Sequence, residues 1–135
     1  MTNKVNQKIQ LLEENLKKLN RLKELNKEEF ISDFRNLEAG KHLLQTSIEA
    51  MIDIANSIIA RQRLREPETS ADAFRILADN EFISQANKEK YIKMTKFRNR
   101  VVHVYSKIDE VEIYNIIQNY LSDYKEFIKE ISGVV

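Results

Sequence analysis

The sequence predicts an all-α fold, and three observations support this prediction. Apolar residues recur every three or four positions along most of the chain, which is the spacing of one face of an α-helix. The 135 residues include two Gly and one Pro, too few for the frequent turns of a β-rich fold. Leu, Lys and Glu, which favour helices, are abundant. An apolar fraction of 42% is enough for a core, so we expect residues 1–135 to form one helical domain.

Charge and cysteine content exclude several classes of protein. The formal net charge is +1, so any contact with nucleic acid must come from a local patch and not from the molecule as a whole. Cysteine is absent, which excludes disulfides and thiolate metal sites. The N-terminal residues lack the apolar core of a secretion signal, and no apolar stretch reaches the length of a membrane span. We therefore expect a cytoplasmic protein that does not contact a membrane.

The first helix is predicted from a regular apolar stripe. The stripe alternates steps of four and three residues, and its members are Val5, Ile9, Leu12, Leu16 and Leu19. Leu22 and Leu25 continue it loosely. The stripe could cover a partner protein, but the interior of the same bundle is the favoured interpretation.

A second helix is predicted to begin at Asn26, because Asn26 can cap it and Glu29 occupies the capping-box position. We expect this helix to run unbroken to about Arg63, with Gly40 as a bend or as its weakest turn. Its apolar positions are Phe30, Phe34, Leu37, Leu44, Ile48, Met51, Ala55 and Ile58.

A break is predicted around Pro67, which lacks a backbone donor and restricts the residue before it. Thr69, with Asp72 three residues later, should cap a short helix through Phe74, Ile76 and Leu77. Asn80 is placed to end that helix in a left-handed conformation.

Two more helices complete the predicted fold. Either Ser84 or Asn87 opens the first, and its core stripe is Met94, Phe97, Val101 and Val104. The capping pair Asp109 and Glu112 opens the last helix, which Gly133 closes. The inner face of that last helix is Ile113, Ile117, Tyr120, Tyr124, Phe127 and Ile131. Four long helices and one short helix are most simply arranged as an antiparallel four-helix bundle with one additional short helix.

The segment most informative about function is the octet Arg98–Tyr105, Arg-Asn-Arg-Val-Val-His-Val-Tyr. On a helix, Asn99 and His103 are four residues apart and share one face, and Arg98 and Tyr105, seven apart, also align. The two polar strips adjoin each other. A helix with this much polar surface is predicted to line a cleft or an interface.

These residue types suit RNA cleavage without a metal. Histidine is the side chain whose ordinary pKa best fits proton transfer near neutral pH, and arginine offers a fixed fork of donors for phosphate oxygens. Asparagine can orient the histidine or bind a phosphate oxygen. The ribose 2′-hydroxyl would be the nucleophile, so the product would be a 2′,3′-cyclic phosphate and DNA would be inert. Spacing alone, however, favours an ordinary surface arginine with a structural histidine.

The octet resembles the signature of HepT proteins, a branch of the HEPN superfamily. The signature is an arginine, four residues, a histidine, one residue and a tyrosine, here Arg98, His103 and Tyr105. Other segments resemble the same family, and the resemblance extends over about residues 31–131. They are the short helix Ala73-Phe74-Arg75-Ile76-Leu77-Ala78, the run Phe97-Arg98-Asn99 and the exit Tyr105-Ser106-Lys107-Ile108-Asp109.

The resemblance implies a HEPN-like homodimer whose paired motif helices line one cleft, and an endoribonuclease that is the toxin of a toxin–antitoxin pair. Arg98 and His103 would be the catalytic pair, with Asn99 as the polar residue of the motif. Tyr105 would be the tyrosine that a minimal nucleotidyltransferase antitoxin modifies with AMP. The added phosphate charge would block the strip shared with Arg98 and so switch the toxin off. Lys96 stands where the family has glycine.

The RNA-binding surface and the metal content are predicted from single residues. Lys93, Lys96 and Arg100 could widen the positive surface beside the motif and bind RNA, or they could form an ordinary solvated face. Two histidines without clustered carboxylates make a poor metal site, so we expect neither a metal nor another cofactor.

The same residues are also compatible with two other functions. A non-catalytic HEPN module would hold a nucleotidyltransferase or nucleic acid, and a purely structural helical dimer would have no affinity for RNA. The intact pair of Arg98 and His103 favours the enzyme, because a scaffold has no need for both residues.

Overall fold

The computed structural model describes residues 3–103 and 108–134, and within these ranges it contains helices and no strands. The predicted all-α class is confirmed. The helices are α1 (Asn3–Lys23), α2 (Lys27–Ser32), α3 (Phe34–Arg61), α4 (Ser70–Asp79), α5 (Gln85–Val102), α6 (Glu110–Asn119) and α7 (Leu121–Ser132). None of these helices is both long enough and apolar enough to cross a membrane.

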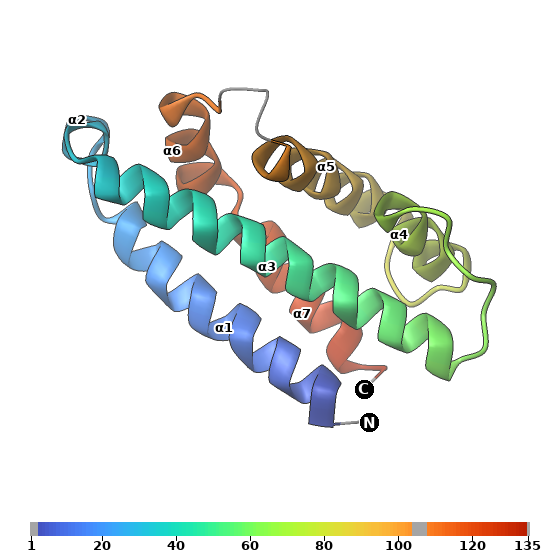
Figure 1. The fold of residues 1–135 in the computed structure, drawn as a ribbon. Coiled ribbons are helices and arrows are strands. Elements are labelled where there is room, and N and C mark those ends of the chain that lie inside the picture. Colours follow the sequence, from blue (N-terminus) through green and yellow to red (C-terminus); the bar gives the residue numbers. More distant parts are fainter. Residues whose placement is uncertain (1–2, 104–107, 135) are drawn as a thin grey trace.

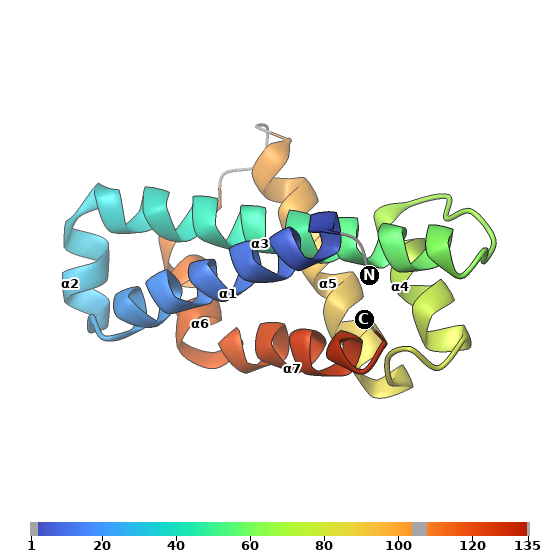
Figure 2. The ribbon, with the colours of Figure 1, turned by 90° about the horizontal axis from the view of Figure 1, so that it is seen from below.

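The long helix α3 is the centre of the bundle. It packs along α1, which runs in the opposite direction, and it also contacts α2, α4, α5 and α6 (Figure 1). Seen from below, α1 lies between α3 and α7, and the beginning of α1 lies near the end of α7 (Figure 2). Helix α5 packs against α3, α4 and α7. The predicted bundle is therefore correct in outline, but two of its long helices are each divided into two.

The apolar stripe of the first helix faces the bundle, as favoured from the sequence. Val5, Leu12, Leu16 and Leu19 are buried and belong to the same core as α3. Because these side chains are covered within one chain, the stripe does not need a partner protein to bury it.

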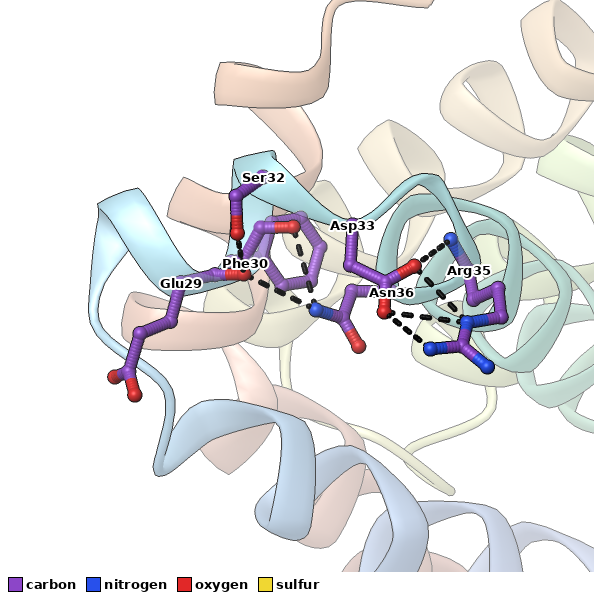
Figure 3. Close-up of polar contacts among 6 residues, drawn as sticks. All are labelled: Glu29, Phe30, Ser32, Asp33, Arg35 and Asn36. Carbon is purple, nitrogen blue, oxygen red and sulfur yellow. Dashed lines mark hydrogen bonds and ion pairs between the residues drawn. The ribbon is translucent and has the colours of Figure 1, made fainter.

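The prediction of one unbroken helix from Asn26 to about Arg63 was wrong, because the chain breaks at Asp33. Asp33 has an extended backbone, with φ −125° and ψ 111°. Its carboxylate accepts hydrogen bonds from the backbone N–H of Arg35, at 3.0 Å, and from the Arg35 guanidinium (Figure 3). The Asn36 side chain donates to the Glu29 carbonyl at 3.3 Å, across the break. These local bonds replace helical ones, which is a known tendency of Asp and Asn.

The break changes which side chains reach the core. Phe30 is fully buried, but Phe34 is 74% exposed, so its predicted place in the apolar stripe was wrong. Gly40, predicted as a bend or as the weakest turn, lies inside α3, and α3 continues through it opposite Ile113 and Ile117 of α6. A Cβ atom there would be 3.0 Å from Cδ1 of Ile117 and 3.2 Å from Cγ2 of Ile113. The absence of a side chain at Gly40 thus permits the close approach of α3 and α6.

Most predicted helix starts are confirmed. Asn26 and Glu29 form the expected capping box, and Thr69 caps α4 by accepting from the Asp72 backbone N–H. Ser84 caps α5, which settles the choice between Ser84 and Asn87. At the end of α4 the prediction was wrong by one residue. Asn80 has φ −102°, and the left-handed conformation, with φ 63°, is that of the next residue.

The prediction of one last helix was also wrong, because Tyr120 separates α6 from α7 with φ −124° and ψ 8°. Tyr120 is 53% exposed and not on the inner face. Asp109 caps α6, but it accepts from the Val111 backbone N–H at 2.9 Å. Glu112 does not complete a capping box, because its carboxylate binds the Arg100 guanidinium instead. Gly133 is the C-cap of α7, as predicted.

The loop between α3 and α4 is held by Asp72. The Asp72 carboxylate accepts two hydrogen bonds from the Arg65 guanidinium, at 2.7 and 2.9 Å, and one from the Glu68 backbone N–H at 3.0 Å. These bonds, led by that to Arg65, lower the pKa of Asp72 to about 2. The ionised carboxylate therefore stabilises the folded chain above its ordinary pKa, and this contribution disappears as the pH falls through about 2.

We expect Asp72→Asn to lower the free energy of unfolding at pH 7, because an amide cannot accept all three of these bonds. The difference from wild type should shrink steadily as the pH falls from about 5 to about 2, where the wild-type carboxyl is itself protonated. Urea unfolding followed by circular dichroism across this pH range measures the difference in the free energy of unfolding between the two proteins. A difference that does not change with pH would exclude an ionic role for Asp72.

Candidate active site

The residues of the predicted catalytic motif lie at the C-terminal end of α5. The inner face of this helix is anchored by buried side chains, among them Tyr91, Met94 and Phe97. The helix ends at Val102, and His103 is its C-cap with φ −87° and ψ 99°. The prediction that the octet continues as a helix was therefore wrong at His103, where the helix ends. Val104 and Tyr105 lie outside the described residues, so the predicted alignment of Arg98 with Tyr105 stays a prediction.

Asn99 connects the other two residues of the motif. Its side-chain Oδ1 accepts a hydrogen bond from Nη1 of Arg98 at 2.9 Å, and its backbone carbonyl accepts from the His103 backbone N–H at 2.9 Å. Asn99 and His103 are exposed, and the Arg98 side chain is 24% exposed. The Arg98 guanidinium and the Asn99 amide thus form a small polar cluster at the end of α5, and the exposed His103 follows them in the chain. Such a site can bind a phosphate group and transfer protons.

Arg98 also contacts α3, which could not be predicted from the motif. Its Nε is 3.7 Å from Oε2 of Glu49, and the same oxygen accepts a hydrogen bond from Nε2 of Gln45 at 3.4 Å. Within residues 3–103 and 108–134, the Arg98 Nε is the buried side-chain polar atom that has no hydrogen-bond partner. In the sequence, Glu49 is marked only as a charged residue between the apolar residues Ile48 and Ala50, both of which are buried in the structure.

The predicted RNA-binding cations have different surroundings. Lys93 and Lys96 are exposed on α5. Arg100 donates to both carboxylate oxygens of Glu112, and its guanidinium lies 5.6 Å from the ring centroid of Phe97. The hydrogen bond to Glu112 raises the pKa of Arg100. Arg100 therefore joins the end of α5 to the start of α6, and its charge is compensated where RNA was expected to bind.

A groove of about 380 Å³ lies beside the motif, between α5 and the pair α6 and α7. Arg98, Asn99 and His103 do not line it. The residues that line it are Lys90, Lys93, Met94, Phe97, Arg100, Glu112, Ile116, Tyr120, Asp123 and Tyr124.

Comparison with known proteins relates this chain to a family of nucleases. Residues 12–131 match the family described as ribonuclease HepT-like. The mRNA nuclease HepT of Shewanella oneidensis is 35% identical over 105 residues, which cover 78% of this chain and 79% of that protein. The tRNA nuclease HepT of Aphanizomenon flos-aquae is 23% identical over 126 residues, which cover 93% of this chain and 86% of that protein.

The fold agrees with the same family. A solved structure of a tri-AMPylated Shewanella oneidensis HEPN toxin, in complex with an MNT antitoxin, matches with a TM-score of 0.91 and 31% identity. The match covers 98% of this chain and 99% of that one. The order and packing of the helices thus agree with the sequence match, and the resemblance seen in the octet is confirmed. This chain belongs to the ribonuclease HepT-like family.

Proposed function

We propose that this chain is an endoribonuclease toxin of a toxin–antitoxin pair, and that Arg98, Asn99 and His103 are its catalytic residues. The observation that carries the proposal is that the three residues lie at the C-terminal end and the C-cap of α5, where the Asn99 side chain accepts a hydrogen bond from Arg98. Membership of a ribonuclease family supports the same reaction class. A non-catalytic binding module would have no need for this arrangement.

The proposed reaction uses groups of the RNA and of the protein alone. The 2′-oxygen attacks the adjacent phosphorus, a histidine imidazole removes the 2′-hydroxyl proton, and the new O–P bond closes a 2′,3′-cyclic phosphate. The bond between phosphorus and the 5′-oxygen breaks, and that oxygen receives a proton from an imidazolium. Arg98 binds the phosphate oxygens, where negative charge increases in the transition state. Asn99 holds the Arg98 guanidinium in place through its Oδ1.

We propose a homodimer in which the two motif helices line one cleft. The two proton transfers could then be divided between the His103 side chains of the two copies. Lys93 and Lys96, both exposed on α5, would bind RNA phosphates beside the cleft. Arg100 was proposed for the same role, but its bonds to Glu112 favour a structural role over a phosphate contact.

The proposed regulation of the toxin is the transfer of AMP to Tyr105 by a minimal nucleotidyltransferase antitoxin. Both proteins would be made in the cytoplasm, and the transfer would take place there. The related Shewanella toxin is described as AMPylated and in complex with such an antitoxin, which supports this proposal. Each AMP would add bulk and negative phosphate charge two residues from His103, and this would repel the RNA backbone.

The proposed function is tested with purified protein and an RNA oligonucleotide in excess EDTA. Intact mass must first show that no AMP is attached. We expect cleavage to 2′,3′-cyclic phosphate ends, and no cleavage of the oligonucleotide when every ribose is replaced by 2′-deoxyribose. If unmodified protein binds RNA without cutting it, the enzyme proposal is wrong and the binding module replaces it. Cleavage that EDTA abolishes would contradict metal independence.

A further inference from the structure

The contact between Glu49 and Arg98 lies behind the proposed catalytic site, at the junction of α3 and α5. The Arg98 Nε is buried and lacks a hydrogen bond, while its Nη1 donates to Asn99. The Glu49 carboxylate is the anion facing that Nε, at 3.7 Å. This distance is roughly 0.5 Å longer than an N–H···O hydrogen bond. A buried polar atom without a partner is uncommon and calls for an explanation.

We propose that Glu49 is a positioning residue for Arg98, which sets the orientation of the guanidinium toward the RNA phosphate. This inference rests on the proposed function. A guanidinium is a planar fork with five donors, and its Nε–H lies on the edge nearest the side-chain stem. An anion at Nε therefore fixes the plane of the fork. With Glu49 at that edge and Asn99 at Nη1, the remaining donors of Arg98 are left for phosphate oxygens.

The position of Glu49 is itself supported from α3. Gln45, one helical turn earlier, donates through Nε2 to the Glu49 oxygen that faces Arg98. Both side chains belong to the long central helix, whose neighbouring residues Ile48 and Ala50 are buried. The sequence of contacts Gln45, Glu49, Arg98 and Asn99 thus runs from a rigid element to the proposed site. A rigid supporting contact of this kind improves catalysis by limiting misplacement of the group that acts.

Steady-state cleavage of one RNA oligonucleotide by Glu49→Ala and Glu49→Gln tests the proposal. Glu49→Ala should lower kcat by roughly 10- to 100-fold, with KM changed by less than about 3-fold, because the error is in transition-state geometry. Glu49→Gln should recover part of the loss, since its amide oxygen can still accept from Nε. Asp53→Ala is the matched control, because Asp53 is also on α3 and pairs with Lys8 of α1 at 3.1 Å. We expect its kcat within about 2-fold of wild type.

A spectroscopic measurement separates this inference from the proposed function. The Nε–H signal of Arg98 in a 15N NMR spectrum should exchange slowly with water in wild type and quickly in Glu49→Ala. If wild type does not cleave RNA, the proposed function fails, and this signal decides the positioning role alone. If wild type cleaves but Glu49→Ala has an equal or higher kcat, the positioning role is overturned. An Nε–H signal that is the same in both proteins overturns it too.

Discussion

Replacing His103 with alanine should lower the rate of RNA cleavage by on the order of 10²- to 10⁴-fold, the size of a lost general acid–base group. His103 is exposed at the end of α5 as its C-cap, and it is not one of the buried residues that form the core. Its backbone N–H bond to the Asn99 carbonyl does not depend on the side chain. The fold and the RNA affinity should therefore remain while the chemistry is lost. Initial rates on a labelled RNA oligonucleotide in EDTA measure this.

His42→Ala is the matched control for this loss. His42 is the other histidine of the chain, and it is exposed on α3. The His42→Ala variant should cleave RNA at the wild-type rate. Circular dichroism and intact mass on all three proteins exclude unfolding and bound AMP. Cleavage by His103→Ala within about 3-fold of wild type would remove His103 from the mechanism, because a proton-transfer group contributes far more than this.

Replacing Phe127 with alanine should lower the free energy of unfolding by about 3–5 kcal/mol, the usual cost of removing a buried phenyl ring. Phe127 is fully buried on α7. Its ring centroid lies 5.3 Å from that of Tyr91 and 5.9 Å from that of Phe74, both in edge-to-face geometry. These three rings join α4, α5 and α7. The cavity left behind would lie among rigid aromatic groups that cannot easily collapse into it.

Urea unfolding at one fixed protein concentration measures this loss, because dimerisation would make the apparent stability depend on concentration. Phe34→Ala removes the same ring from a side chain that is 74% exposed, and it should change the free energy of unfolding by less than about 0.5 kcal/mol. Equal losses in the two variants would show that the aromatic cluster is not a centre of stability.

The candidate site could be predicted only as far as its residues are neighbours in sequence. Asn99 and His103 are four residues apart, so helical geometry alone relates them, and the backbone bond between them agrees. Arg98 and Glu49 belong to different helices, and only the packing of α5 on α3 brings them to 3.7 Å. The pairing of Arg100 could not be predicted for the same reason, because its partner belongs to another helix. The positive charge of Arg100 suggested RNA binding, but Glu112 at the start of α6 pairs with it.

The two helix breaks were not predicted, because they too depend on the tertiary structure. Residues around Asp33 and Tyr120 fit a continuing helical pattern, and neither position carries a Gly or a Pro. Asp33 breaks the helix because its carboxylate and the Asn36 amide bind nearby backbone and side-chain groups. The free-energy difference between forming such side-chain bonds and continuing the helix is small, so the rest of the fold decides which of the two occurs.

The sequence by itself determined the all-α class, most of the helix starts, the bundle-facing stripe of α1 and the family to which the motif belongs. Each of these depends on residue spacing or on caps within one turn, which are local properties of the chain. The tertiary structure alone decided the close approach at Gly40, the pairing of Arg100 with Glu112 and the contact of Glu49 with Arg98. These depend on how helices far apart in the sequence cross. Crossing is set by the packing of whole helix surfaces, which no single residue pattern encodes.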